Sequence, residues 1–192
     1  MLKPEEIWNI FQKSEALLEG HFKLTSGKHS NRYIQCAKVL QYPDSTKALC
    51  AEISRRLEVD KIEVVVGPAT GGIIIAYEIA RQLGVKTMFT ERENGRMSLR
   101  RGFSIEKGQK VLVVEDVVTT GGSVKETIEV LKNEGAQVTA CASLVDRSSG
   151  KVDFGIPFVS LLALEVKAFE AEDCPLCAQG IPVVKPGSRQ EV

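Results

Sequence analysis

Short apolar runs rich in β-branched residues recur along the chain and alternate with stretches of helical spacing. Runs that look like buried strands cover residues 62–66, 86–90, 111–114, 138–145 and 158–166. Apolar residues spaced three and four apart predict helices over residues 4–18, 44–57, 73–83 and 123–135. Because strands and helices alternate, we expect an α/β fold with a central parallel sheet flanked by helices.

The segments outside this alternation predict a small extra lobe and a loop. Residues 21–35 place a polar, glycine-centred turn between two strand-like pieces, which indicates a hairpin lobe, or hood. Residues 91–101 are polar, contain four arginines and show no clear period, so we expect a mobile loop there. We divide one domain into a hood of about residues 1–40, a core of about 41–166 and a C-terminal tail of about 167–192.

The stretch 111–123 carries the strongest chemical signal. Four apolar residues run into Glu115 and Asp116, where we expect the strand to end. Residues 119–123 then form a small-residue turn whose backbone N–H groups could surround an anion. Ser123, with Glu126 three residues later, predicts a capping box that opens a helix toward the same anion. The stretch thus offers carboxylates for hydroxyl groups beside a phosphate cradle.

Other polar loops should meet this stretch. In an open parallel sheet, ligands bind beyond the carboxyl ends of the strands, so the loops after Val66, Thr90, Val114 and Val145 should gather at one edge. The common nucleotide motifs do not explain the site. No GxGxxG follows a strand, and Gly27-Lys28 lacks the rest of a P-loop.

Composition narrows the class of protein. The chain has 192 residues, of which 43% are hydrophobic, so it can bury a core without disulfides. Basic and acidic residues balance at 25 each, which gives no sign of nonspecific binding to nucleic acid or membranes. The first residues are acidic, and no apolar run approaches the ~20 residues of a membrane helix. We expect a cytoplasmic protein that binds neither nucleic acid nor membranes.

The cysteines fall into two groups. Cys36, Cys50 and Cys141 lie in apolar segments and should be buried, reduced thiols. Cys174 and Cys177 have the CxxC spacing of a zinc half-site or a redox pair, but no second pair and no neighbouring histidine supplies further ligands. We expect a turn in the tail here, with an intersubunit metal site or a disulfide as alternatives.

The acidic pair followed by Thr-Thr-Gly-Gly-Ser resembles the signature of type I phosphoribosyltransferases, which use 5-phosphoribosyl-1-pyrophosphate. The resemblance implies that Glu115 and Asp116 hold the ribose hydroxyls and that residues 119–123 hold the 5′-phosphate. It also implies Mg²⁺, held mainly by the substrate and retained with help from the carboxylates. The donor site that it implies comprises Glu115, Asp116, Val117, Val118, Thr119, Thr120, Gly121, Gly122 and Ser123.

Two further segments resemble parts of the same family. Residues 67–71, Gly-Pro-Ala-Thr-Gly, are similar to its pyrophosphate loop, which implies contacts from Ala69, Thr70 and Gly71. Residues 91–101 resemble its flexible catalytic loop, which usually closes over the neighbouring subunit's site. That likeness implies a homodimer with shared sites. Arg92 and Arg96 become candidates to neutralise the departing pyrophosphate, because guanidinium groups bind phosphate oxygens in a bidentate way.

The hood indicates the base that accepts the ribose. Residues 24–30, Leu-Thr-Ser-Gly-Lys-His-Ser, resemble the N-terminal segment of orotate phosphoribosyltransferases, and Asp146-Arg147 resembles that family's Asp-Arg. The likeness implies an orotate site, with Arg147 facing the carboxylate and ring carbonyl. Its other members would be Thr119, Tyr33, Ile34 and Thr25. A transferase for a purine or another base, and a regulator that binds the donor without catalysis, remain alternatives.

Overall fold

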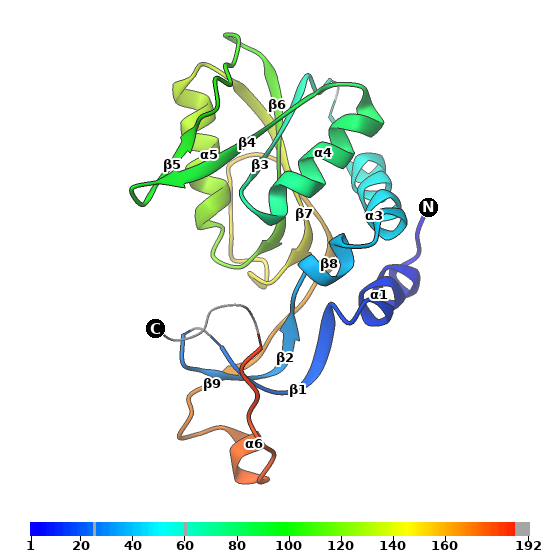
Figure 1. The fold of residues 1–192 in the computed structure, drawn as a ribbon, viewed down its shortest axis with the longest axis vertical. Helices are drawn as coiled ribbons and strands as arrows, with labels where there is room; N and C mark the ends of the chain where they lie inside the picture. Colours follow the sequence, from blue (N-terminus) through cyan, green and yellow to red (C-terminus); the bar gives the residue numbers. More distant parts are fainter. Residues whose placement is uncertain (25, 60, 187–192) are drawn as a thin grey trace.

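The computed structural model describes residues 1–24, 26–59 and 61–186. Two sheets stand one above the other: a larger one with helices on both faces, and a smaller one formed by the two ends of the chain (Figure 1). Thr25, expected at the base site, lies outside the described residues. Within the described ranges, no helix is long and apolar enough to cross a membrane.

The larger sheet has the strand order β5-β4-β3-β6-β7-β8. All neighbouring pairs are parallel except β4 with β5, so the expected parallel sheet is confirmed apart from one antiparallel edge. Its strands are β3 (Val64–Pro68), β4 (Lys86–Glu93), β5 (Arg96–Leu99), β6 (Lys110–Val118), β7 (Gln137–Asp146) and β8 (Phe158–Ala163).

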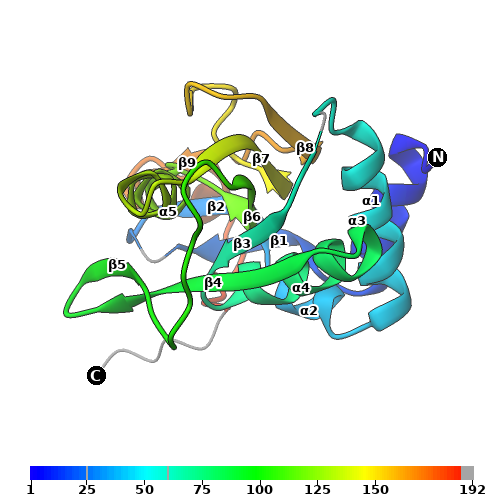
Figure 2. The same ribbon diagram turned by 90° about the horizontal axis from the view of Figure 1, so that it is seen from above.

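Alternating side chains of the central strands bury both faces of this sheet. In β6, Leu112 and Val114 join the core beneath α3 (Pro43–Arg56) and α4 (Gly71–Leu83). Val111 and Val113 join the core beneath α5 (Gly122–Asn133), on the opposite face (Figure 2). These four side chains are fully buried, which explains why the strand is a continuous apolar run in the sequence.

In the hood, β1 (Leu17–Lys23) and β2 (His29–Ile34) form a hairpin, and β9 (Ala168–Phe169) of the tail joins them in a three-stranded antiparallel sheet. The expected hairpin is therefore present. The helix before it, α1 (Pro4–Lys13), is shorter than the predicted 4–18. The Ser14 hydroxyl donates to the carbonyl of Ile10, and Glu15 turns the chain with a φ of 53°, so the next residues leave the helix and enter β1.

Residues 91–101 correct the expectation of an aperiodic loop. Most of them extend β4 and form β5, joined by a tight turn at Asn94 and Gly95, whose φ angles are 51° and 81°. Such an Asn-Gly turn matches the right-handed twist of a hairpin. Met97 is buried, whereas Arg92 and Arg96 are exposed, so the hairpin combines an apolar contact to the core with charged side chains at its surface.

The tail runs back along the hood. After β9 comes one helical turn, α6 (Pro175–Ala178), and Val184 then bridges to Phe22 beside β1. The Val184 N–H donates to the carbonyl of His21, and the Lys23 N–H donates to the carbonyl of Val184. Outside these strands, α2 (Ala37–Leu40) links the hood to the core.

Candidate active site

The acidic pair lies near the end of the central strand, at the edge that faces the hood (Figure 1). We expected the strand to end at Glu115 and Asp116. It continues beyond them, because Val117 and Val118 still pair with β7. Both carboxylates are half-buried and bind backbone N–H groups. The Asp116 N–H donates to Glu115 Oε1 at 3.1 Å, and the Val117 N–H donates to Asp116 Oδ1 at 2.9 Å.

The setting of Glu115 disfavours its ionised form. Burial, then the charge of the adjacent Asp116, raise the pKa of Glu115 to about 9. At neutral pH the free protein therefore holds a proton on Glu115, while cations or hydroxyl donors would favour its charged form. The pair is an acidic site arranged for a ligand that brings positive charge or hydrogen-bond donors.

The loop between β3 and α4 packs directly on Asp116. A Cβ at Gly71 would overlap the Asp116 carboxylate, and a Cβ at Gly67 would overlap the carbonyl of Gly72. Glycine at these positions is what lets the backbone come this close. Ala69 and Thr70, at the exposed tip of the loop, lie just before α4, and the Ala69 N–H is bonded to the carbonyl of Thr90 in β4.

The turn after β6 forms a small cavity of about 150 Å³ lined by residues 115 and 117–124. Its helix cap differs from the expected capping box. Gly121, with a φ of 73°, is the N-cap of α5, and neither Ser123 nor Glu126 caps the helix through its side chain. A Cβ on Gly121 would overlap Val152, so the glycine is needed for both conformation and space. The open N-terminus of α5 still points its free N–H groups toward this cavity.

Arg147 follows β7 and brings a guanidinium to the same edge. Its backbone N–H donates to the carbonyl of Val118 at 2.7 Å, next to the cradle. Its Nε is buried and has no hydrogen-bond partner among the described residues. Desolvation lowers the pKa of Arg147, and the nearby Tyr33 and Cys36 act against that shift. A buried guanidinium donor without a partner is costly and is a feature expected of a binding site for an anion.

The hood contributes the segment that covers this edge. Tyr33 is half-buried, and its hydroxyl donates to Gln35 Oε1 at 2.9 Å. Ile34 turns its side chain into the core, so only its backbone could contact a ligand. Sequence reasoning missed Cys36 as a neighbour of the site. Its buried thiol donates to the carbonyl of Asp116 at 3.8 Å, a contact between residues 80 positions apart that no local motif reveals.

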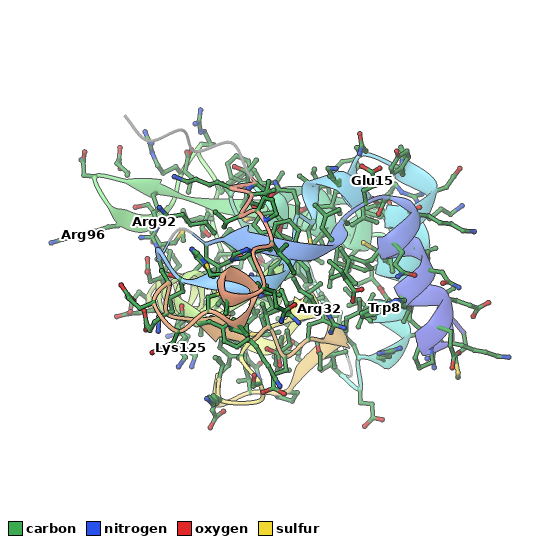
Figure 3. The ribbon with its side chains drawn as sticks, turned by 90° about the horizontal axis from the view of Figure 1, so that it is seen from below. Trp8, Glu15, Arg32, Arg92, Arg96 and Lys125 are labelled. Atoms are coloured by element: carbon green, nitrogen blue, oxygen red, sulfur yellow. The ribbon has the colours of Figure 1, made fainter. Side chains whose placement is uncertain are left out.

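The hairpin arginines do not join the acidic pair within this chain. Arg92 binds Glu126 on α5 and the carbonyl of Gly95, each at 2.8 Å. Arg101 pairs with Glu91 at 2.8 Å. Arg96 projects from the hairpin away from the body of the protein (Figure 3). Among the described residues, the structure therefore brings the predicted donor and base residues to one edge of the sheet but leaves Arg92 and Arg96 on an outlying hairpin.

Comparisons with known proteins agree with this geometry. A family model described as "Phosphoribosyl transferase domain" matches residues 39–176. Orotate phosphoribosyltransferase of Desulforamulus reducens is 59% identical over 186 residues, covering 97% of each chain. That of Pelotomaculum thermopropionicum is 60% identical over 186 residues, covering 97% of this chain and 98% of its own.

A solved structure gives the same result. The crystal structure of orotate phosphoribosyltransferase from Aeropyrum pernix has 31% sequence identity and a TM-score of 0.67, covering 82% of this chain and 93% of that one. Sequence, family model and fold thus agree, and the sequence relatives match nearly the whole chain. The chain belongs to the orotate phosphoribosyltransferase family.

Proposed function

We propose that this chain transfers the phosphoribosyl group of 5-phosphoribosyl-1-pyrophosphate to N1 of orotate, releasing pyrophosphate and giving orotidine 5′-monophosphate in pyrimidine biosynthesis. The observation that carries the proposal is one sheet edge where three features meet: a half-buried acidic pair, a phosphate-sized cavity, and the Nε of Arg147, which has no hydrogen-bond partner within residues 1–24, 26–59 and 61–186. An acceptor with its own negative charge suits that guanidinium better than a neutral base does.

The donor would lie along β6 and the turn after it. Glu115 and Asp116 would accept hydrogen bonds from the ribose hydroxyls, because ionised carboxylates are acceptors only. The turn of residues 119–123 would bind the 5′-phosphate through backbone N–H groups at the open N-terminus of α5. Val118 would contribute backbone only, since its side chain is buried in the core, whereas the side chain of Val117 is half-buried beside it.

Pyrophosphate would leave toward the loop of Ala69, Thr70 and Gly71, whose tip is exposed beside Asp116. We propose Mg²⁺ as the cofactor. The residues of the chain fit this ion, because the acidic pair offers oxygen ligands to a hard cation. A nearby cation would also favour the charged form of Glu115, whose pKa is raised by burial and by Asp116. When bound, the ion would neutralise charge on the leaving pyrophosphate. The residues of the chain would position the donor, orient its ring and exclude water.

The base would lie between Arg147 and the hood. Arg147 would bind the orotate carboxylate and carbonyl, while Tyr33 and the backbone of Ile34 would close the other side. Thr119, exposed at the start of the turn, would add a hydroxyl contact. Thr25 is retained as a proposed member on the resemblance alone.

Arg92 and Arg96 would act on pyrophosphate in the site of a second subunit. Two features support a homodimer. The arginines lie on an outlying hairpin (Figure 3), and α4 exposes Ile74 and Tyr77 at 44% and 61%, an apolar surface that a partner would cover.

The five cysteines form no disulfide, which suits the reducing cytoplasm as the place of action.

Supplying the purified protein with donor, Mg²⁺ and one base at a time tests the function. We expect release of pyrophosphate with orotate and none with adenine, xanthine or uracil. A protein that binds the donor but does not release pyrophosphate with any of the bases would be a regulator, and the proposal would fail.

Mixing an Asp116→Asn chain with an Arg96→Ala chain tests the shared site. If sites are shared, the mixture should have more activity than either variant has alone.

A further inference from the structure

Four potential metal ligands meet in the hood, away from the acidic pair. His21 comes from β1, His29 from β2, and Cys174 and Cys177 flank the start of α6. The ligand atoms of all four lie within 4.8 Å of one another. This corrects the expectation that no histidine completes the CxxC pair. The histidines are distant in sequence, up to 156 residues from the cysteines, but neighbours in the fold.

The sulfur-to-nitrogen distances around His21 and Cys177 are close to those of a tetrahedral site. Bond lengths of about 2.3 Å to sulfur and 2.0–2.1 Å to nitrogen place S and N ligands about 3.6 Å apart around a zinc ion. Cys174 Sγ and Cys177 Sγ lie 3.5 and 3.7 Å from His21 Nε2, and Cys177 Sγ lies 3.3 Å from His29 Nδ1. The two ring nitrogens are 2.8 Å apart and would separate by about half an ångström to share an ion.

The surroundings of His21 fix the tautomer that a metal needs. Its Nδ1 lies 2.7 Å from the carbonyl oxygen of Ile181. Because a carbonyl only accepts, Nδ1 must carry the proton, and Nε2 then presents its lone pair to the cluster. Metal-bound histidines commonly donate their second ring N–H to such a carbonyl, which orients the ring.

Burial indicates a closed, structural site. His21, His29 and Cys174 are 3%, 7% and 2% exposed, whereas Cys177 is exposed and leaves a path for the ion. Four protein ligands fill a tetrahedral shell, so no position remains for a substrate or an activated water. Two sulfur and two imidazole ligands select zinc over the hard cations that the acidic pair suits.

We propose that His21, His29, Cys174 and Cys177 bind one Zn²⁺ ion per chain, which fastens the C-terminal tail to the hood hairpin. Besides this cluster, tail and hairpin are joined by the short pairing of β2 with β9, an ion pair between Lys28 and Glu170, the bond between His21 and Ile181, and the backbone bonds of Val184. Binding replaces the thiol protons with the metal and links three chain segments, so the free energy of binding stabilises the hood.

Metal content is the primary test, made on untagged full-length protein purified under reducing conditions. We expect about one zinc per chain by elemental analysis, as for a Cys₂His₂ structural site. Replacing the ion with Co²⁺ should give the visible absorption of tetrahedral cobalt with thiolate charge transfer. Reduced protein without zinc and without that cobalt spectrum would overturn the proposal, as would a Cys174–Cys177 disulfide that persists in the purified protein.

Matched variants assign the ligands. Cys177→Ser changes an exposed residue and should fold, but its zinc content should drop to a small fraction of the parent value. Cys50→Ala, which changes a buried free thiol of α3, should keep its zinc. Unchanged zinc in the first variant, or equal loss in both, would contradict the assignment.

Hydrogen exchange tests what the ion does. A zinc-selective chelator added in excess Mg²⁺ should increase amide exchange in residues 17–34 and 168–184 while leaving β3 and β6 protected. Uniform protection before and after complete zinc removal would mean that the ion does not fasten the tail. The outcome is independent of the proposed transferase activity, because neither readout uses a substrate.

Discussion

Replacing Glu115 with glutamine should stabilise the protein at neutral and alkaline pH while it impairs catalysis. The carboxylate is half-buried next to Asp116, and its pKa is raised from 4.5 to about 9. In the unfolded chain Glu115 loses its proton once the pH exceeds its ordinary pKa of 4.5. In the folded chain it keeps the proton up to about pH 9. The unfolded state therefore binds fewer protons between the two values, and stability falls as pH rises through that window.

The size of the effect follows from the shift. One pKa unit corresponds to 1.36 kcal/mol. Because pH 7 lies about 2.5 units above the pKa of Glu115 in the unfolded chain, the carboxylate can lower the free energy of unfolding at pH 7 by at most about 3 kcal/mol. Partial exposure of Glu115 and local relaxation reduce this, and we expect a gain of about 1–2 kcal/mol for Glu115→Gln. Glutamine keeps an oxygen that can accept from the Asp116 N–H.

Urea unfolding followed by circular dichroism, repeated from pH 5 to pH 9, measures the difference. The variant's advantage should be small near pH 5, grow with pH and level off near pH 9. Glu129→Gln, which changes an exposed carboxylate on α5, is the control and should show no comparable pH-dependent gain. A Glu115→Gln protein that is no more stable than the parent at any pH would refute the reasoning about desolvation and charge at this pair.

Three further substitutions test the site. Arg147→Ala should raise the orotate KM by about 10- to 100-fold, the value of a charged hydrogen bond, and an unchanged KM would remove Arg147 from the base site. Asp116→Asn should lower kcat by about tenfold or more through loss of a charged acceptor, and unaltered turnover would argue against hydroxyl binding there. Gly121→Ala should cost about 2 kcal/mol or more in thermal unfolding, because φ is positive and the new Cβ meets Val152. Gly108→Ala, also at positive φ but in open space, should cost less; equal losses would show that the overlap with Val152 is relieved without cost.

Much of the fold could be predicted because the core strands are buried on both faces. The continuous apolar run 111–114 and the mostly apolar run 138–145 became β6 and β7, and the alternation with helices indicated the parallel order. The ends of the strands were harder to predict from the sequence. Val117 and Val118 extend β6 past the carboxylates, because pairing with β7 outweighs the polar interruption. The Asn94-Gly95 pair is typical of a hairpin turn, but the charged residues around it led us to predict a loop.

The site was predictable where its chemistry is local and hidden where it depends on contacts between distant segments. The acidic pair and the glycine turn are contiguous, so the sequence revealed them together. The approach of Cys36 to Asp116 and the meeting of His21 with Cys174 join residues 80 and 153 positions apart. Ser123 and Glu126 illustrate another limit: they satisfy the pattern of a capping box, but Gly121 caps the helix and Glu126 binds Arg92 instead.

The most direct test of the account is the choice of acceptor by the purified protein. With 5-phosphoribosyl-1-pyrophosphate and Mg²⁺, orotate should be consumed and orotidine 5′-monophosphate and pyrophosphate should appear in equal amounts, with adenine, xanthine and uracil left unchanged. Product from one of those bases, with none from orotate, would contradict the assignment of Arg147 and the hood as an orotate site.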